Sequence, residues 1–319
     1  MKDGNGVVQP VMQACGHDIH VTCLLAAAEA MVNMRAFWKG TLILVFQPAE
    51  ELGDGAKAMV EDGLYKKVPI PDVVLGQHVM PDRAGRIGNR TGAMLAASDS
   101  LKITLFGRGG HASMPSKCID PIVMAAAVVM KLQTIVSREL DPKEFAVLTI
   151  GSLQAGSAEN VIADRAEMKV NVRTADSKIK AKVLAAIERI IKSECEASAA
   201  PLPPLIEKTS SFPVTYNDEG ITRIVQSAFS NFFGKDFNPE MPFVNGSEDF
   251  SYLGTSIDRP TCFWMIGGTD PKIFDKAEKE GKLDLLPVNH SALFAPVMQP
   301  TIKVGVDALT LAAMRFLEA

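Results

Sequence analysis

Apolar and polar positions alternate in blocks along the first third of the chain. A continuous apolar run at 41–46 predicts a buried strand, preceded by an apolar helix around 21–34 and followed by a short helix at about 56–61. A further strand is predicted at 73–77. Strands that alternate with helices favour a doubly wound α/β sheet, whose ligands gather at the carboxyl ends of the strands.

From about residue 99 the pattern changes to longer strands and two long helices. The predicted order is strand, helix, strand, strand, helix and strand, at 101–106, 121–140, 145–151, 166–173, 178–197 and near Leu205. This order is that of the ferredoxin-like βαββαβ unit, which folds as a compact insert. We therefore expect an inserted domain at 99–210 and a discontinuous first domain formed by 1–98 and 211–319.

Composition narrows the class of protein. The 319 residues are 47% apolar and 22% charged, which is typical of a folded chain long enough for two cores. A formal net charge of -4 supplies no basic surface, which argues against nucleic acid as a partner. The longest apolar stretch ends at Lys131, so we expect no membrane span.

The cysteines and the start of the chain bear on its location. No apolar secretory segment opens the chain, and the five cysteines are odd in number and widely scattered. These features predict a cytoplasmic protein with reduced thiols, of which at least one is available as a metal ligand.

Two strong metal ligands stand close together at the start of a predicted helix, in Cys15-Gly16-His17-Asp18. Backbone donors and the dipole at a helix start favour an ionised sulfur, and thiolate and imidazole both bind zinc-like ions. Taken alone, a small buried cysteine and a helix-start histidine explain the same residues.

Paired carboxylates follow the strand predicted at 41–46, in Gln47-Pro48-Ala49-Glu50-Glu51. Two adjacent negative charges are costly at that place unless a cation compensates them. Because adjacent side chains diverge, one carboxylate can bind a metal while its neighbour reaches a metal-activated water. The alternative is a solvated pair at a helix start, where glutamate is common.

Two histidines complete a candidate ligand set. His78 lies at the end of the strand predicted at 73–77, and His290 lies in a polar turn late in the chain. Each alone is more often structural, but Cys, His and Glu at successive strand ends form a candidate metal site. The glycines at 107–110 lack a phosphate-loop fingerprint, and no Gly-x-Ser-x-Gly elbow is present, so metal-dependent hydrolysis is favoured.

Seven motifs in the same order resemble those of one family, the aminoacylase, hippurate hydrolase and auxin-conjugate hydrolase branch of the dinuclear zinc peptidase (aminoacylase and carboxypeptidase) superfamily. They are Ala14-Cys15-Gly16-His17-Asp18, Gln47-Pro48-Ala49-Glu50-Glu51, Gly76-Gln77-His78-Val79, Gly107-Arg108-Gly109-Gly110-His111-Ala112, Asn160-Val161-Ile162-Ala163-Asp164, Gly246-Ser247-Glu248-Asp249-Phe250 and Asn289-His290.

The resemblance implies a metallopeptidase-type catalytic domain, an inserted domain that serves as a lid and dimerisation surface, and a homodimer. It also implies two divalent metal ions, zinc or manganese, with the cysteine bridging them and with the ligands Cys15, His17, Glu51, His78 and His290.

Catalytic roles follow from the same resemblance. Glu50 would be the general base, and His111 would stabilise the oxyanion at the reacting carbonyl. Asn160 and Arg173 are candidates for holding the substrate carboxylate through charge-assisted hydrogen bonds, although a solvated strand position explains Arg173 equally well.

The implied activity is cleavage of the amide bond of a small N-acyl amino acid. Two alternatives stay open: a dipeptidase or carboxypeptidase of the same superfamily, and a truncated, catalytically inactive metal-binding fragment. Family members carry a longer segment before the Cys-Gly-His motif, with a strand resembling Arg-x-Asp-Met-Asp beside the metal site. Here fourteen residues precede Cys15, so we expect an N-terminally truncated chain.

Overall fold

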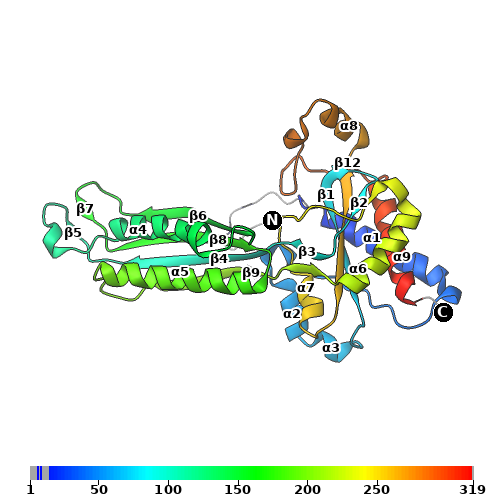
Figure 1. Ribbon diagram of the computed structural model, residues 1–319, viewed down its shortest axis with the longest axis horizontal. Coiled ribbons are helices and arrows are strands. Elements are labelled where there is room, and N and C mark those ends of the chain that lie inside the picture. The colour runs from blue at the N-terminus through cyan, green and yellow to red at the C-terminus, as the bar shows by residue number, and fades with distance from the viewer. Residues whose placement is uncertain (1–5, 7, 9–13, 318–319) are drawn as a thin grey trace.

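The computed structural model describes residues 6, 8 and 14–317. An elongated arm, built from the middle of the chain, extends from an α/β unit that contains both the early and the late parts (Figure 1). The chain enters the arm at the start of β4 (Ala97–Phe106) and leaves it at the end of β9 (Leu205–Phe212).

The α/β unit is built on a mixed sheet with strand order β1-β12-β2-β11. Its two long strands, β1 (Val74–Arg83) at one end of the order and β12 (Thr261–Thr269), run parallel to each other. The other two strands are short: β2 (Ile87–Gly88) and β11 (Phe237–Asn238). A small antiparallel pair, β3 (Gly92–Leu95) with β10 (Thr215–Asn217), leads toward the arm.

Helices cover both faces of this sheet, because β12 is apolar on both sides. Trp264 and Ile266 face a core shared with α1 (His17–Asn33), α6 (Glu219–Phe233) and α9 (Thr301–Leu317). Phe263 and Met265 point the opposite way, as alternation along a strand requires, toward α2 (Gly55–Glu61) and α7 (Ser251–Thr255). The expected α/β class with a two-sided sheet is confirmed. Two further helices lie in this unit, α3 (Leu64–Lys67) and α8 (Pro271–Lys279).

The arm, called the lid below, is an antiparallel sheet with strand order β6-β8-β4-β9, covered by two long helices. In chain order its elements are β4, α4 (Pro121–Thr134), β6 (Ala146–Ala155), β8 (Arg165–Thr174), α5 (Ser177–Ala197) and β9, which is the predicted βαββαβ order. At its far tip, β5 (Gly110–His111) pairs with β7 (Val161–Ile162).

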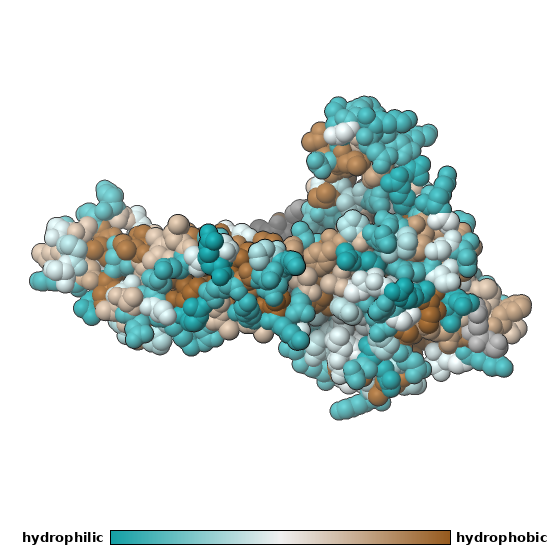
Figure 2. Space-filling view, in the orientation of Figure 1, coloured by the Kyte–Doolittle hydropathy of each residue, from teal (hydrophilic) through white to brown (hydrophobic). Residues whose placement is uncertain are grey.

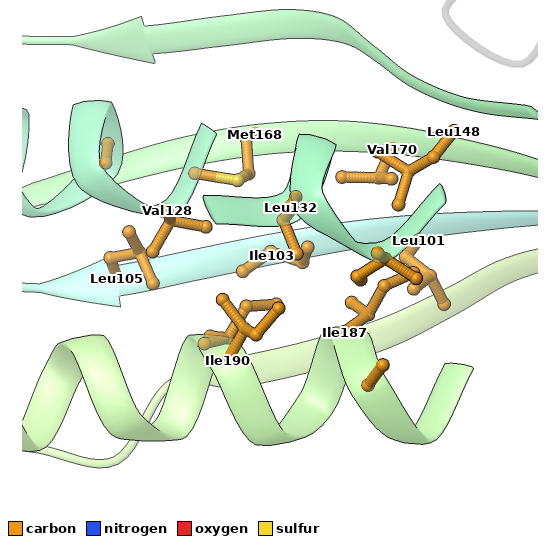
Figure 3. Close-up of a cluster of buried hydrophobic side chains, with 14 of the residues drawn as sticks. Leu101, Ile103, Leu105, Val128, Leu132, Leu148, Met168, Val170, Ile187 and Ile190 are labelled. Carbon is orange, nitrogen blue, oxygen red and sulfur yellow. The ribbon is translucent and has the colours of Figure 1, made fainter. Parts of the chain in front are cut away.

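One face of the lid sheet carries its core. Side chains from alternate positions of β4 and β8, such as Ile103 and Met168, meet Leu132 of α4 and Ile187 of α5 (Figure 3). The intervening positions of β4 and β8 are polar, for example Lys102 and Glu167, which form an ion pair. This inward apolar and outward polar alternation is typical of an antiparallel sheet with one solvated face.

The helical stretch Pro121–Glu139 continues past Lys131, where the uninterrupted apolar run ends, and agrees with the helix predicted at 121–140. Within the described part of the chain, it is the one helix that is long and apolar enough to span a membrane by length and composition. Its inward side chains, including Met124, Val128 and Leu132, pack in the lid core, and a core helix passes the same test.

The strand predicted at 41–46 is wrong as an element. The segment does not form a strand, and among the described residues it pairs with no strand of the sheet. Val45 packs against the core below β12, whereas Leu44 and Phe46 are 39% and 45% exposed. An apolar run becomes a strand only where a neighbouring strand exchanges hydrogen bonds with it, and none of the described strands pairs with this run.

Candidate metal centre

Cys15 and His17 are separated by a tight turn that opens α1. Gly16 has a φ of 82°, and a Cβ added there would lie 2.5 Å from Val79 Cγ1, so the turn tolerates only glycine. The turn places the Cys15 side chain, which is 7% exposed, against β1 and puts His17 at the first position of the helix.

His78 is presented by β1 with its ring orientation fixed. Its Nδ1 donates to the Val79 carbonyl at 2.7 Å, since a carbonyl can only accept. The neutral ring therefore keeps Nε2 free of a proton, and this atom lies 3.4 Å from Cys15 Sγ. Burial lowers the pKa of His78 to about 4, which favours the neutral form that binds metal.

Glu50 and Glu51 lie in a short 3-10 turn, Glu50–Leu52, flanked by left-handed residues at Ala49 and Gly53. Glu50 Oε2 is 3.6 Å from His17 Nε2, and the two oxygens of Glu51 face different histidines. Glu51 Oε1 lies 3.7 Å from His17 Nε2, and Glu51 Oε2 lies 3.2 Å from His290 Nε2.

The segment around His290 closes the site from the other end of the chain. The His290 backbone N–H donates to the Ala14 carbonyl at 2.7 Å, with a left-handed φ of 70°. Asn289 Nδ2 donates to the carbonyls of Cys15 and Val79 at 3.3 and 3.1 Å, and approaches Cys15 Sγ at 3.7 Å. A single amide thus fixes the Cys15 turn to β1.

The five predicted ligands form two overlapping sets. One set is Cys15, His17 and His78, and the other is Cys15, Glu51 and His290, with the donor atoms of each set within 4.8 Å of one another. Thiolate, imidazole and carboxylate suit zinc-like ions, and the shared cysteine suits a bridge between two cations. The donor set therefore fits two divalent metal ions.

The charges of the site are unbalanced in the protein alone. Burial and then the charge of Glu51 raise the pKa of the Cys15 thiol to about 12. Burial, Glu51 and Asp249 raise the pKa of Glu50 to about 7. The ion-pair partners of Glu50 and Glu51 are the imidazoles of His17 and His290, which carry charge only when protonated. Bound cations would supply the missing positive charge.

Several residues around the site were predicted neither as metal ligands nor as catalytic residues. His20 is left out by sequence reasoning, yet its Nε2 accepts the Val79 N–H at 2.9 Å and its ring lies 4.4 Å from that of His78. Glu248 and Asp249 are 7% and 1% exposed and share a carboxylate cluster with Glu50. Burial, and then the charge of Glu50, raise the pKa of Glu248 well above its usual range.

Three predicted residues lie elsewhere. His111 and Asn160 are at the far tip of the lid, remote from the metal ligands of the same chain (Figure 1). Arg173, on β8, donates to the Asn245 carbonyl at 2.5 Å and to Ser247 Oγ at 3.3 Å, so it contacts a loop of the α/β unit. The roles predicted for these three residues stay predictions.

An α/β unit that gathers two overlapping ligand sets, with a ferredoxin-like βαββαβ arm inserted in it, defines a protein of the dinuclear metallopeptidase class. The model of peptidase family M20/M25/M40 matches residues 2–281, and the chain belongs to this family.

Curated relatives have related activities in their names. The chain is 37% identical over 259 residues to IAA-amino acid hydrolase ILR1-like 4 of Arabidopsis thaliana, covering 80% of this chain and 58% of that protein. It is 41% identical over 247 residues to hippurate hydrolase of Campylobacter jejuni, covering 76% and 63%. The chain thus spans about three fifths of the length of these relatives.

Solved structures share the fold over almost the whole chain. A crystal structure from methicillin-resistant Staphylococcus aureus superposes with a TM-score of 0.78 at 30% identity, covering 97% of this chain and 75% of that one. The YXEP protein of Bacillus subtilis, described as a dinuclear metal binding peptidase from the M20 family, gives 0.74 at 26% identity, covering 97% and 74%.

Proposed function

We propose that the chain hydrolyses the amide bond of small N-acyl amino acids at a centre of two divalent metal ions, zinc or manganese. The observation that carries the proposal is the pair of ligand sets that share Cys15, with Glu50 beside them. Names of relatives add support, among them hippurate hydrolase and an N-acetyl-L-cysteine deacetylase of Bacillus subtilis.

The residues divide the chemistry between them. When bound, the two cations polarise the amide carbonyl and lower the pKa of the attacking water. Glu50 takes up the proton of this water and delivers it to the leaving nitrogen, a role that suits a carboxyl whose pKa is raised toward neutrality. Glu51 is held between His17 and His290 and serves as a ligand, so the neighbouring carboxylates have separate tasks.

His111 is suited to stabilise the oxyanion. Its Nδ1 accepts the Ser113 backbone N–H at 3.1 Å, so the neutral ring carries its proton on Nε2. That N–H is free to donate to a developing negative charge on the carbonyl oxygen. Because His111 lies at the lid tip, it reaches a metal centre either on a second copy or after a large lid movement.

A homodimer through the lid supplies His111 most simply. Helix α4 exposes a row of apolar side chains on its outer face, with Ile122, Val123 and Met130 at 44%, 66% and 71% exposure. Figure 2 shows apolar side chains exposed along the arm. Strand β6 is the end strand of the order β6-β8-β4-β9, so one of its edges is open to pairing in the described chain.

The test is release of amino acid from N-acetyl, N-benzoyl and indole-3-acetyl amino acids by protein loaded with zinc or manganese. We expect turnover that needs metal, and a fall in kcat of about 10²- to 10⁴-fold in Glu50→Gln, which keeps all five ligands. Equal rates for wild type and Glu50→Gln would exclude the proposed general base. Metal-loaded wild type without turnover on any substrate would favour the inactive fragment.

A peptidase is the second candidate function. Thermostable carboxypeptidase 2 of Saccharolobus solfataricus is 32% identical over 312 residues, covering 97% of this chain and 74% of that protein. Including dipeptides and benzoyl-blocked dipeptides in the same panel separates the two functions, because the preferred substrate is the one with the higher kcat/KM.

A further inference from the structure

One buried carboxylate holds both ends of the turn that carries Glu50 and Glu51. Asp249 Oδ1 accepts a hydrogen bond from Gln47 Nε2, just before the turn. Asp249 Oδ2 accepts the backbone N–H of Ala56 at 2.9 Å, in the first turn of α2 just after it. Asp249 is 1% exposed and Ala56 fully buried, so water cannot replace either bond readily.

The turn depends on such anchoring. Ala49 adopts a left-handed φ of 53°, which is unfavourable for a residue with a Cβ, and the segment before it joins no ladder of the sheet in the described chain. The end of the turn is closely packed, since a Cβ added to Gly53 would lie 2.8 Å from the Phe212 ring. Without its anchors the turn has several conformations available, each with different carboxylate positions.

Asp249 is itself fixed by its neighbour. The backbone N–H groups of Asp249 and Phe250 both donate to Glu248 Oε1, at 3.0 and 3.2 Å. The backbone at Asp249, just before α7, is therefore held by hydrogen bonds to the Glu248 side chain. The two oxygens of the Asp249 carboxylate accept from two different donors.

We propose that Asp249 is a positioning residue that sets where Glu50 and Glu51 stand relative to His17 and His290. The inference rests on the proposed metal centre, because it assigns Asp249 the task of placing one ligand and the general base. Asp249 does this through the turn, by accepting from Gln47 on one side and from Ala56 on the other.

Because both Asp249 oxygens accept hydrogen bonds, one substitution can break a single anchor of the turn without changing the shape of the side chain. Asp249 is an acceptor at both oxygens, and an asparagine side chain in its place would present an NH2 group to one of the two donors. Asp249→Asn alone therefore breaks one anchor while preserving shape. The double change Gln47→Glu with Asp249→Asn reverses one donor and its acceptor, restores both hydrogen bonds and keeps the net charge.

The experiment has two readouts on purified full chain. Hydrogen exchange of the 47–56 amides is followed in metal-free protein, and zinc affinity is measured by calorimetry. Asp249→Asn is expected to speed exchange at Ala56 and in the turn, and to weaken zinc binding by about 10- to 100-fold. The double variant is expected to recover both. Asp99→Asn is the matched control, an equally buried aspartate whose partners are Lys180, Lys208 and Ser211 in the lid.

The outcomes separate the inference from the proposed function. Asp249→Asn with wild-type exchange and wild-type zinc affinity would overturn the inference, and so would a double variant no better than the single one. The same holds if Asp99→Asn weakens zinc binding as much, since the effect would then be general destabilisation. Wild type that binds no zinc, yet protects Ala56 in a manner lost in Asp249→Asn, would contradict the metal centre while supporting the anchor.

Discussion

Among single residues, Glu50 shows that the acidic side chains of the metal centre destabilise the folded protein when no metal is bound. Glu50 is 19% exposed at its side chain, and its neighbours Glu51 and Asp249 are also acidic. Its pKa of about 7 lies above the ordinary value of 4.5 that applies to the unfolded chain. In metal-free protein the ionised carboxylate is therefore disfavoured by folding.

This pKa shift predicts that Glu50→Gln raises the free energy of unfolding of the metal-free protein, by an amount that depends on pH. The ionisation cost is absent below pH 4.5, grows as pH rises through the interval from 4.5 to about 7, and is complete above it. We expect metal-free Glu50→Gln to be more stable than wild type by about 2–3 kcal/mol at pH 8, with a difference that shrinks toward pH 4.5. Urea unfolding in the presence of a chelator measures this, and a variant no more stable at pH 8 would contradict the assigned cause.

Ligand residues could be predicted from the sequence better than the residues that hold them. Cys15 and the Glu50-Glu51 pair lie in short motifs in which the neighbouring residues alone indicate metal binding. Asn289 and Asp249 lie in two of the motifs that carry the family resemblance, but they act through hydrogen bonds to residues more than 190 positions away. Their local sequence therefore does not show which residues they hold in place. His20 had one usable signal, its spacing of three from His17, which places both on one side of a helix.

Among the secondary-structure elements, the segment at 41–46 shows that an apolar run alone does not determine a strand. The apolar run at 41–46 predicts a strand, but a strand also needs a hydrogen-bonded partner, and the structure assigns no strand to this run. The strands predicted at 101–106 and 166–173 did form, as β4 and β8, and they pair with each other in the lid sheet. Their apolar side chains at alternate positions pack in the lid core. Two-residue strands such as β2 and β11 are set by tertiary pairing and leave no periodic signal.

Hydrogen exchange should distinguish these elements. Amides at 42–46 are expected to exchange far faster than those at 262–266 of β12, because the former have no ladder bonds to any strand that the structure describes and the latter are buried between two cores. Mass spectrometry of peptic fragments measures both segments in one sample. Comparable protection in the two would mean that 41–47 is paired with another strand in solution.

In the whole molecule, the tip of the lid, where β5 carries His111, is too far from the metal centre of the same chain for His111 to act there. Turnover is therefore expected to require assembly of two chains, whereas metal binding requires one chain only. Val123→Asp with Met130→Asp places charge on the exposed apolar face of α4. We expect this variant to run as a monomer in light scattering, to bind metal as wild type does, and to lose hydrolysis.

The matched control is Ile273→Asp, an exposed apolar residue, 57% accessible, on helix α8 of the other unit. It should leave both the mass in solution and the rate unchanged. A dimer that survives Val123→Asp with Met130→Asp, or a monomer that still turns over at the wild-type rate, would exclude the lid as the source of His111 from a second copy.

Whether one cysteine is shared by two metal ions is tested by a calorimetric titration of zinc into metal-free wild type and into Cys15→Ala. Because Cys15 belongs to both ligand sets, we expect wild type to bind two equivalents and the variant to lose tight binding at both positions. Two equivalents bound tightly by Cys15→Ala, or a single equivalent bound by wild type, would contradict a dinuclear centre built around the shared cysteine.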